Sequence, residues 1–462
     1  MEFHEYIESL KNKRICVIGA GVSNLPLIEA LCCAGHDVTV CDKRTQVEMG
    51  EQGETLVHQG AKLHLGTAYL EGLDGFDLIF RTPGLLPLNP FLKRASDKGV
   101  EITSEMEVFF KLCPCKTIAI TGSDGKTTTS TVIAELLRAA GKTVHLGGNI
   151  GHPLLCDVPQ MTKDDICVLE LSSFQLHSMY CKPDVAVITN VSPNHLDVHP
   201  DYEDYQNAKK SVYLHQDGAC RLVVNADNDI TNAFGSEAPS EVYRFSRKGP
   251  VTRGAFYENG KIWFTDGSAA REVIAIDEIK IPGMHNVENY MAALCAVSGM
   301  VDDETFRGVA RTFAGVAHRL ELIRELHGVK YINDSIASSP TRAIAGLRSF
   351  KPTDRLILIV GGHDKHVPFD ELGEEICQRC KALFICGETA DAISAAVRNS
   401  QYYTPNFHMF VNADWRENVL EASRFAEAGD TVLLSPACSS FDFFKNFAQR
   451  GDLFREIVMG LT

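Results

Sequence analysis

Residues 121–128, with the sequence Thr-Gly-Ser-Asp-Gly-Lys-Thr-Thr, have the residue types of a phosphate-binding loop. They follow an apolar strand predicted for residues 117–120 and lead into a helix predicted for residues 130–140. Small residues let backbone N–H groups approach a polyphosphate, Lys126 adds a mobile cation, and the Thr127 hydroxyl suits Mg²⁺. We therefore expect ATP to bind Gly122, Ser123, Asp124, Gly125, Lys126, Thr127 and Thr128.

The spacing within this loop differs from that of the standard P-loop. That motif has four residues between its first glycine and its Gly-Lys pair, whereas only two separate Gly122 from Gly125. The short loop therefore points away from the standard P-loop proteins.

Two later strands carry polar side chains that could bind a metal ion. Glu170 ends an apolar strand, where a carboxylate is costly unless it is paired or bound to a metal. A second apolar strand, predicted for residues 184–189, leads into a polar loop that contains Asn190, His195 and Asp197. Glu170 and His195 are therefore candidate ligands of Mg²⁺.

Two further features have simpler interpretations. Lys209 and Lys210 lie in a helix predicted for residues 205–214, and their residue types alone favour two solvated lysines. A second helix is predicted to start at about Asn286, after a Pro-Gly turn, and asparagine is a common N-cap residue.

The first block of the chain has a Rossmann-like pattern. A strand at 14–18 leads into a glycine-containing loop at 19–24, then a helix, and a second strand follows at 37–41. Asn24 stands where a dinucleotide fingerprint has its third glycine, so the motif alone is weak. A third strand is predicted at 78–81. Asp42, at the end of the second strand, is where such a fold would hold a ribose, and the turn Thr82-Pro83-Gly84 lies at the expected carboxyl edge of the sheet, where ligands bind.

The last block repeats the alternation of strands and helices. Its apolar strands at 356–360 and 431–434 both end in small and polar residues, which predicts a second parallel sheet whose carboxyl edge faces a ligand. At roughly 150 residues per domain, the length indicates about three domains. The expected boundaries are 1–106, 107–315 and 316–462.

Composition excludes several classes of protein. A net charge of −15 argues against nonspecific binding to nucleic acid or to an anionic membrane. The sequence has neither an apolar signal segment nor an apolar run long enough for a membrane span, so we expect a cytoplasmic protein without membrane insertion. The 15 cysteines are interpreted as reduced thiols, many in the core. Cys113-Pro114-Cys115 is interpreted as a linker, too isolated for a zinc site.

The order of these motifs resembles that of the Mur ligase family. The phosphate loop is similar to the family's Thr-Gly-Thr-Asn-Gly-Lys-Thr-Thr, including its short spacing. The other matching motifs are 147–151 (Gly-Gly-Asn-Ile-Gly), 170–174 (Glu-Leu-Ser-Ser-Phe), His195, Lys209, His285-Asn286, His318-Arg319, 435–437 (Ser-Pro-Ala) and 447–451 (Phe-Ala-Gln-Arg-Gly). The resemblance spans the whole chain. It implies three α/β domains: an N-terminal Rossmann-like domain, a central P-loop-type ATPase domain with a mostly parallel sheet, and a C-terminal Rossmann-like domain.

The resemblance also implies an activity, that of an ATP-dependent amide ligase in the synthesis of peptidoglycan precursors. ATP would phosphorylate the alanine carboxylate of UDP-N-acetylmuramoyl-L-alanine, and the amine of D-glutamate would attack the acyl phosphate. Two Mg²⁺ ions are implied, one held by Thr127 and Glu170 and the other by His195. Lys209 would be carbamylated, which turns a cation into a metal-binding anion. A monomer that acts on small molecules is expected.

The remaining roles are carried over from the family residue by residue. Lys126, Asn149, His195 and Lys209 would be catalytic, with Asn149 and His195 next to the acyl phosphate. Asn286 would contact the adenine, and Arg319 and Asp334 the nucleotide. The UDP end of the other substrate would bind Gly21, Val22, Ser23, Asp42, Lys43, Arg44, Thr82 and Gly84. The amino-acid site would comprise Ser338, Lys365, Ser440, Phe441 and Phe447.

Several residues depart from the family pattern. Asp124 replaces the usual asparagine, and its side chain should either turn away from the phosphates or cap the helix. Ile336 stands where many relatives have lysine, and His363-Asp364 where others have Asp-Gly, so L-glutamate or another amino acid is an alternative substrate. Folylpolyglutamate synthase has a related architecture but lacks a UDP-binding first domain. An NAD(P)-linked oxidoreductase or nucleotide sensor built on the first block is the alternative from another class.

Overall fold

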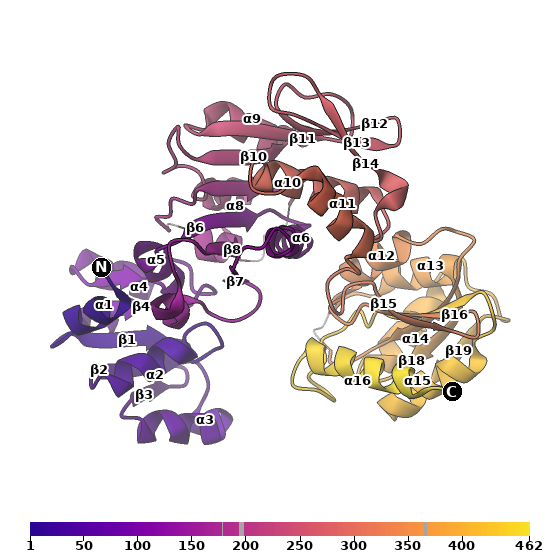
Figure 1. Cartoon of the computed structure of the whole chain (residues 1–462). Coiled ribbons are helices and arrows are strands. Elements are labelled where there is room, and N and C mark those ends of the chain that lie inside the picture. Colours follow the sequence, from indigo (N-terminus) through magenta and orange to yellow (C-terminus); the bar gives the residue numbers. More distant parts are fainter. Residues whose placement is uncertain (178, 194–197, 365–366) are drawn as a thin grey trace. The chain divides into compact units, whose positions relative to one another are not determined.

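The structure is a computed structural model that describes residues 1–177, 179–193, 198–364 and 367–462. Three residues of the sequence analysis lie outside the described residues: the candidate metal ligand His195, Asp197 in the same loop, and Lys365 of the expected amino-acid site. Internal contacts divide the chain into two compact units, Met1–Phe313 and Ala314–Thr462, and each is described by itself below (Figure 1).

The first part of unit one is built on a five-stranded sheet with the order β3-β2-β1-β4-β5, in which every neighbouring pair is parallel. This order is that of a Rossmann-like domain and confirms the prediction. The strands are β1 (Arg14–Ile18), β2 (Asp37–Asp42), β3 (Lys62–Leu65), β4 (Leu78–Phe80) and β5 (Glu101–Thr103). The helices are α1 (Phe3–Ser9), α2 (Leu25–Cys33), α3 (Gln46–His58), η1 (Leu73–Gly75), α4 (Pro90–Asp97) and α5 (Glu105–Leu112).

The strand predicted as the third of this sheet is the fourth along the chain. The missed strand is β3, whose four residues are all exposed or only partly buried. Strands β1 and β4, by contrast, are almost wholly buried and read as continuous apolar runs.

The second part of unit one has a nine-stranded sheet with the order β14-β13-β12-β11-β10-β9-β6-β8-β7. It is parallel from β12 to β7, and only the edge hairpins β12–β13 and β13–β14 are antiparallel, as predicted for a mostly parallel sheet. The strands are β6 (Lys116–Thr121), β7 (Val144–Gly148), β8 (Ile166–Glu170), β9 (Val185–Ile188), β10 (Arg221–Asn225), β11 (Glu241–Ser246), β12 (Gly254–Glu258), β13 (Lys261–Thr265) and β14 (Arg271–Ala275). The helices are α6 (Lys126–Ala139), η2 (Leu155–Gln160), α7 (Ser173–Leu176), α8 (Tyr202–Lys210), α9 (Asp229–Glu237), η3 (Ile276–Glu278), α10 (Met284–Val297) and α11 (Asp303–Thr312).

Three helices of this part start earlier than predicted. α6 begins at Lys126, because Gly125 adopts a left-handed conformation (φ 77°) and serves as its N-cap residue. α8 begins at Tyr202, capped by Asp201. α10 begins at Met284 after Gly283, so Asn286 lies in its first turn and the N-cap interpretation of Asn286 was wrong.

Unit two contains one six-stranded sheet with the order β15-β16-β20-β17-β18-β19. Only the β15–β16 pair is antiparallel, which confirms the second, Rossmann-like parallel sheet. The strands are β15 (Glu321–Leu326), β16 (Val329–Asn333), β17 (Arg355–Val360), β18 (Cys380–Ile385), β19 (His408–Val411) and β20 (Asp430–Leu434). The helices are α12 (Pro340–Arg348), α13 (Asp370–Arg379), α14 (Ala390–Asn399), α15 (Trp415–Phe425) and α16 (Phe447–Gly460).

The three sheets establish a three-domain α/β fold, but the exact domain boundaries stay a prediction. The expected boundary at 106/107 falls inside α5. One apolar core runs from Ile7 in α1 to Phe234 in α9, so the first two sheets share part of their packing. None of the helices in the described ranges is long and apolar enough to cross a membrane.

Candidate active site

The phosphate loop joins β6 to α6 and depends on its two glycines. Gly122 has φ 148°, and a Cβ built there would lie 1.9 Å from Oγ1 of Thr189. Lys126 reaches back over the loop and donates from Nζ to the carbonyl oxygens of Gly122 and Ser123, both at 2.9 Å. The loop is therefore closely packed and holds its lysine beside the backbone that would surround a phosphate.

Asp124 is not the N-cap residue of the helix that follows the loop. Its side chain is exposed, and Gly125 rather than Asp124 is the N-cap residue of α6, with no side-chain cap. The Asp124 backbone is fixed instead, because its N–H donates to Oδ1 of Asn190 at 3.0 Å and its carbonyl accepts from Thr189 Oγ1 at 2.6 Å. Of the two expectations for Asp124, capping of the helix is therefore wrong, and an orientation away from the phosphates stays a prediction.

Lys209 is buried beneath the phosphate loop, so its interpretation as a solvated lysine was wrong. Its side chain donates from Nζ to the Gly122 carbonyl at 2.9 Å and lies 4.5 Å from the centre of the Tyr205 ring. Burial, together with the charge of nearby Lys126, lowers the pKa of Lys209 well below its ordinary value. Lys210 on the same helix is partly exposed and pairs with Glu237.

Glu170, at the end of β8, has the donor set expected of a cation ligand. The carboxylate is 1% exposed and sits beside Ile120 of β6, just before the phosphate loop. Asn149 orients it, donating from Nδ2 to Oε1 at 2.8 Å. Within the described part of the chain the other oxygen, Oε2, is buried and accepts no hydrogen bond. Since a buried carboxylate oxygen without a donor is costly, a bound cation fits this position.

A chain of hydrogen bonds beside this site was missed in the sequence. Ser173 Oγ lies 3.0 Å from Nε2 of His199, whose Nδ1 lies 2.6 Å from one oxygen of Asp204. The other oxygen of Asp204 lies 2.9 Å from Nε2 of His177. The network fixes the start of α7 against α8. Ser173 belongs to the motif recognised at 170–174, whereas His177, His199 and Asp204 were not identified from the sequence.

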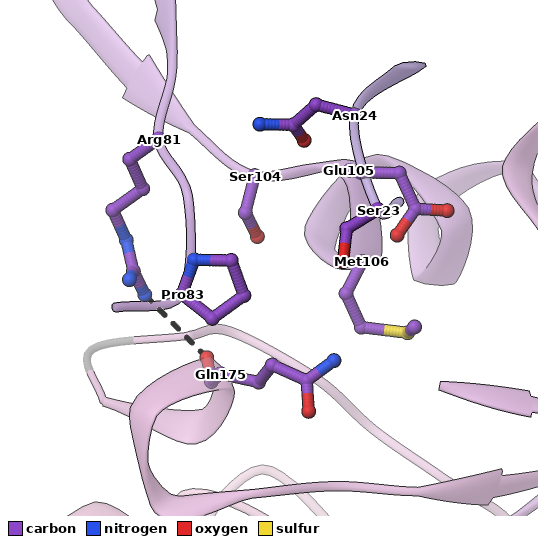
Figure 2. A pocket seen from close by; sticks show the side chains of 8 residues that line it. All are labelled: Ser23, Asn24, Arg81, Pro83, Ser104, Glu105, Met106 and Gln175. Atoms are coloured by element: carbon purple, nitrogen blue, oxygen red, sulfur yellow. Dashed lines mark hydrogen bonds between the residues drawn. The ribbon is translucent and has the colours of Figure 1, made fainter. Parts of the chain in front are cut away.

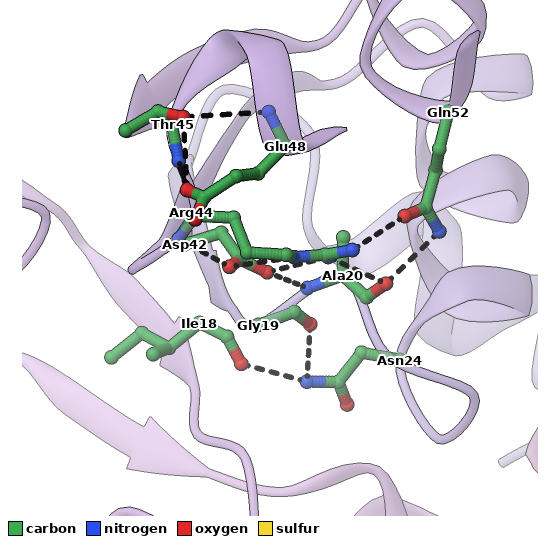
Figure 3. A network of polar contacts seen from close by, with 9 residues as sticks. All are labelled: Ile18, Gly19, Ala20, Asn24, Asp42, Arg44, Thr45, Glu48 and Gln52. Atoms are coloured by element: carbon green, nitrogen blue, oxygen red, sulfur yellow. Dashed lines mark hydrogen bonds and ion pairs between the residues drawn. The ribbon is translucent and has the colours of Figure 1, made fainter. Parts of the chain in front are cut away.

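The first Rossmann-like sheet holds Asp42 in a dense polar network (Figure 3). Its carboxylate accepts from the Ala20 N–H at 2.9 Å and from the Arg44 guanidinium at 2.8 Å. Although burial opposes it, these bonds lower the pKa of Asp42 to about 2. Asn24, in place of a third glycine, donates to the carbonyl of Ile18 at 2.9 Å. Asp42 and Asn24 thus fix the loop at the carboxyl end of β1, where Val22 is 76% exposed.

A small pocket lies between the first sheet and α7 (Figure 2). Arg81, at the end of β4, is 3% exposed and donates to backbone carbonyls of the α7 segment, including His177 O at 2.9 Å and Gln175 O at 3.5 Å. Glu105 accepts from the Leu155 N–H at 3.1 Å. Neither Arg81 nor Glu105 was identified as a site residue from the sequence. The residues that line the pocket are Ser23, Asn24, Arg81, Pro83, Ser104, Glu105, Met106 and Gln175.

Asn286 is linked to the phosphate-loop helix through one neighbour. It donates to the Pro282 carbonyl at 2.6 Å and accepts from Asn289 at 3.2 Å, and Asn289 in turn accepts from Thr129 of α6 at 3.2 Å. The structure therefore places Asn286 at the start of α10, next to the helix that follows the phosphate loop.

In unit two, Asp334 follows β16 and is 4% exposed. It accepts from Ser435 Oγ at 2.8 Å and from the Leu320 N–H at 3.2 Å. Burial raises its pKa to about 7, and Arg319 is among the charges that oppose the rise. Asp334 and Arg319, both expected near the nucleotide, therefore lie close together.

A buried arginine joins the loops that carry the expected amino-acid site. Arg450 of α16 donates from Nε to Ser335 Oγ at 3.1 Å and from Nη2 to the carbonyls of Ser335 and Cys438 at 3.0 and 3.1 Å. Its Nη1 donates to the Ser439 carbonyl at 3.3 Å. Arg450 was missed as a functional residue, although it belongs to a motif recognised in the sequence.

The described residues of unit two that are expected to bind the amino-acid substrate lie in or next to these loops. Ser440 is 2% exposed, whereas the rings of Phe441 and Phe447 are 66% and 38% exposed. Ser338 is partly buried, and His363 pairs through Nδ1 with Glu388 at 2.7 Å. Ser338, His363 and Ser440 thus follow the carboxyl ends of β16, β17 and β20, and Phe447 begins α16.

The described residues include a glycine-containing loop with a lysine between β6 and α6 in unit one, and a second group of expected site residues in unit two. The middle domain of Mur ligases matches residues 120–297, the Mur ligase glutamate ligase domain matches 318–438, and the MurD-like N-terminal domain of Mur ligases matches 13–104. The chain belongs to the Mur ligase family.

Similar proteins agree with this assignment. The UDP-N-acetylmuramoylalanine–D-glutamate ligase of Acetivibrio thermocellus is 48% identical over 99% of this chain and 98% of its own. The ligase of the same name from Ruminiclostridium cellulolyticum is 47% identical over 100% of this chain and 99% of its own. Among solved structures, the UDP-N-acetylmuramate-alanine ligase of Thermotoga maritima shares the fold, with a TM-score of 0.60, 17% identity, and coverage of 97% and 99% of the two chains.

Proposed function

We propose that this protein uses ATP to join D-glutamate to UDP-N-acetylmuramoyl-L-alanine, through an acyl phosphate, in the synthesis of peptidoglycan precursors. The relatives that carry this name are similar over their full length, which supports the same activity here. The observation that carries the proposal is Glu170, buried beside the phosphate loop with one oxygen that accepts no hydrogen bond among the described residues.

ATP is proposed to bind the loop between β6 and α6. Backbone N–H groups at the start of α6 would bind the phosphates, and Lys126 would exchange its bonds to the loop carbonyls for bonds to phosphate oxygens. Thr127 and Glu170 would hold Mg²⁺, with His195 at a second ion. Bound Mg²⁺ would neutralise negative charge that develops during phosphoryl transfer. Asn149 would keep the Glu170 carboxylate in its binding orientation.

The low pKa of Lys209 supports the proposal that it is carbamylated. A neutral amine can attack carbon dioxide, whereas an ammonium group cannot, and its burial favours the neutral amine. The resulting carbamate would be an anion beside the phosphate loop, where it could bind a metal ion.

The two substrates are proposed to bind at the ends of parallel strands. The UDP group would bind the loop after β1, with Gly21, Val22 and Ser23, next to the pocket that Arg81 lines. D-Glutamate would bind in unit two near Ser338, Ser440 and Phe447, and Lys365 would pair with one of its carboxylates.

The test is release of phosphate from ATP and Mg²⁺ with UDP-N-acetylmuramoyl-L-alanine and either D- or L-glutamate. We expect release with D-glutamate, and mass spectrometry should show the ligated product. Release with L-glutamate alone would contradict the proposed amino acid and make Ile336 and His363 the residues to exchange. Glutamate-dependent turnover of a folate without any of the UDP substrate would contradict the whole proposal.

A further inference from the structure

Three cysteines that are distant in sequence come together in unit one, outside the proposed active site. Cys113 is the C-cap residue of α5, Cys115 precedes β6, and Cys167 lies in β8. The Sγ atom of Cys167 is 3.2 Å from that of Cys115 and 3.7 Å from that of Cys113. The Sγ atoms of Cys113 and Cys115 are 3.5 Å apart. The interpretation of this segment as an isolated linker was therefore wrong, because Cys167 lies beside it.

We propose that Cys113, Cys115 and Cys167 form a binding site for a thiophilic cation, Zn²⁺ or Cu⁺. Thiolates are the ligands that these ions prefer in proteins. No part of the proposed ligase chemistry uses this group.

The spacing of the sulfur atoms suits a cation. With bonds of about 2.3 Å, the sulfurs of a tetrahedral zinc site lie about 3.8 Å apart. An increase of at most about 0.6 Å in the distances between the three Sγ atoms would give one triangular face of such a site. A slightly larger increase would give the trigonal arrangement that is common for Cu⁺. Small side-chain rotations would be enough, because each Cys has a rotatable χ1 angle.

The surroundings supply soft ligands and access. Met161 Sδ lies 3.7 Å from Cys167 Sγ, so a thioether borders the three thiols. Cys113 is only partly buried, which opens the cluster to an incoming ion, whereas Cys115 and Cys167 are 8% and 0% exposed. A bound cation would connect the end of α5, the start of β6 and the strand that carries Glu170. Its expected effect is to stabilise unit one.

A matched control exists in the same unit. The Sγ atoms of Cys16 and Cys41 are 3.3 Å apart and both residues are buried, but only two thiols meet there. Two thiols packed in a core do not make a three-ligand site. Replacing Cys16 should therefore leave metal binding unchanged, while replacing Cys113 or Cys167 should abolish it.

The experiment uses the full chain, reduced and kept without oxygen. The protein is incubated with Zn²⁺ or with Cu⁺ in separate arms, with excess Mg²⁺ present, then desalted, and the metal per chain is counted by elemental mass spectrometry. We expect about one equivalent in at least one arm, lost in Cys113→Ala and Cys167→Ala and kept in Cys16→Ala. Cys113 is partly exposed, so its variant should fold even if Cys167→Ala does not, and far-UV circular dichroism checks both.

A second readout identifies the ligands. Co²⁺ in place of Zn²⁺ should give the intense charge-transfer absorption of cobalt thiolates, which Cys113→Ala should remove. Three results would overturn the proposal: no retained metal in either arm, undiminished binding in the folded Cys113→Ala variant, or an intact mass that shows a disulfide within the cluster after reduction. Metal that persists in the cysteine variants would point instead to His177, His199 and Asp204, the other such group in the described chain.

Discussion

The amine of Lys209 illustrates how one buried group can connect several parts of the proposed site. It contacts the Gly122 carbonyl and faces the Tyr205 ring, and Tyr205 lies 2.9 Å from Ser123 of the same loop. A charged ammonium in this position would face the positive charge of Lys126 without a buried acid as partner among its described contacts. Conversion to a carbamate would remove that repulsion and supply a metal ligand.

We predict that Lys209→Ala lowers kcat by at least about 100-fold, the range of a lost electrostatic group in an active site. Short carboxylates such as acetate should restore part of the activity, because they can occupy the space of the carbamate, and should leave the wild type unchanged. Steady-state kinetics measure both. Carbon-13 NMR in labelled bicarbonate should show a carbamate signal in the wild type and none in the variant. Lys210→Ala is the control. Full activity of Lys209→Ala would contradict the prediction.

Glu105 provides a prediction on the pH dependence of stability. Burial raises its pKa to about 7 from an ordinary value of 4.5, against the opposing effect of the Leu155 N–H. Between these values the unfolded chain releases this proton while the folded chain keeps it. The contribution of Glu105 to stability therefore falls as the pH rises through this window.

We expect Glu105→Gln to be more stable than the wild type at pH 8, by at most about 3 kcal/mol, and this advantage to vanish below about pH 4.5. Glutamine keeps an oxygen that can accept from the Leu155 N–H without a charge. Urea unfolding at several pH values measures the difference. Glu54→Gln, at an exposed position of α3, is the control. An advantage that does not depend on pH would show that ionisation is not its source.

At the scale of elements, the site residues lie where strands end, and this is what sequence could predict. Glu170 was identified because an acid ends an apolar strand, and Asp334 through the motif that follows β16. Arg81 and Arg450 were missed, because each binds a backbone carbonyl far away in the sequence, that of His177 for Arg81 and that of Ser335 for Arg450. Cys167 was also missed as a partner of Cys113 and Cys115, since the pairing of β8 with β6, which sets Cys167 opposite Thr117, brings it near.

The phosphate loop gives the prediction at this scale. Gly122→Ala should abolish ATP binding, because the added Cβ would overlap Oγ1 of Thr189 and the backbone has a positive φ. Calorimetric titration with ATP and Mg²⁺ measures the loss, expected to exceed about 100-fold in Kd. Gly218→Ala is the control, since a Cβ there meets nothing within 4 Å. Normal ATP affinity of Gly122→Ala would mean that the loop adjusts without cost.

At the scale of the whole molecule, the two units have separate cores. Residues of the first two sheets share one cluster of buried side chains, whereas the two clusters of unit two begin at Val329 and Ala337. The chain has 2 tryptophans, Trp263 in β13 and Trp415 in α15, so each unit carries its own fluorescent reporter.

We predict that UDP raises the unfolding temperature reported by Trp263 and not the one reported by Trp415. A ligand that binds one unit stabilises that unit, by about 2.7 kcal/mol at 100 times its Kd. The Trp415→Phe variant isolates the first signal and Trp263→Phe the second. Addition of D-glutamate alone is the control and should not change the Trp263 signal. Equal shifts of both signals with UDP would contradict independent unfolding.

The position of Arg450 bears on how the protein acquires its activity during synthesis on the ribosome. The loops after β16 and β20 are held from inside by a side chain of the last helix, so their binding geometry requires residues that are translated late. A nascent chain that has already formed the phosphate loop and the first Rossmann-like sheet would still lack the loops proposed to bind D-glutamate. Ligation would therefore begin only after α16 has docked.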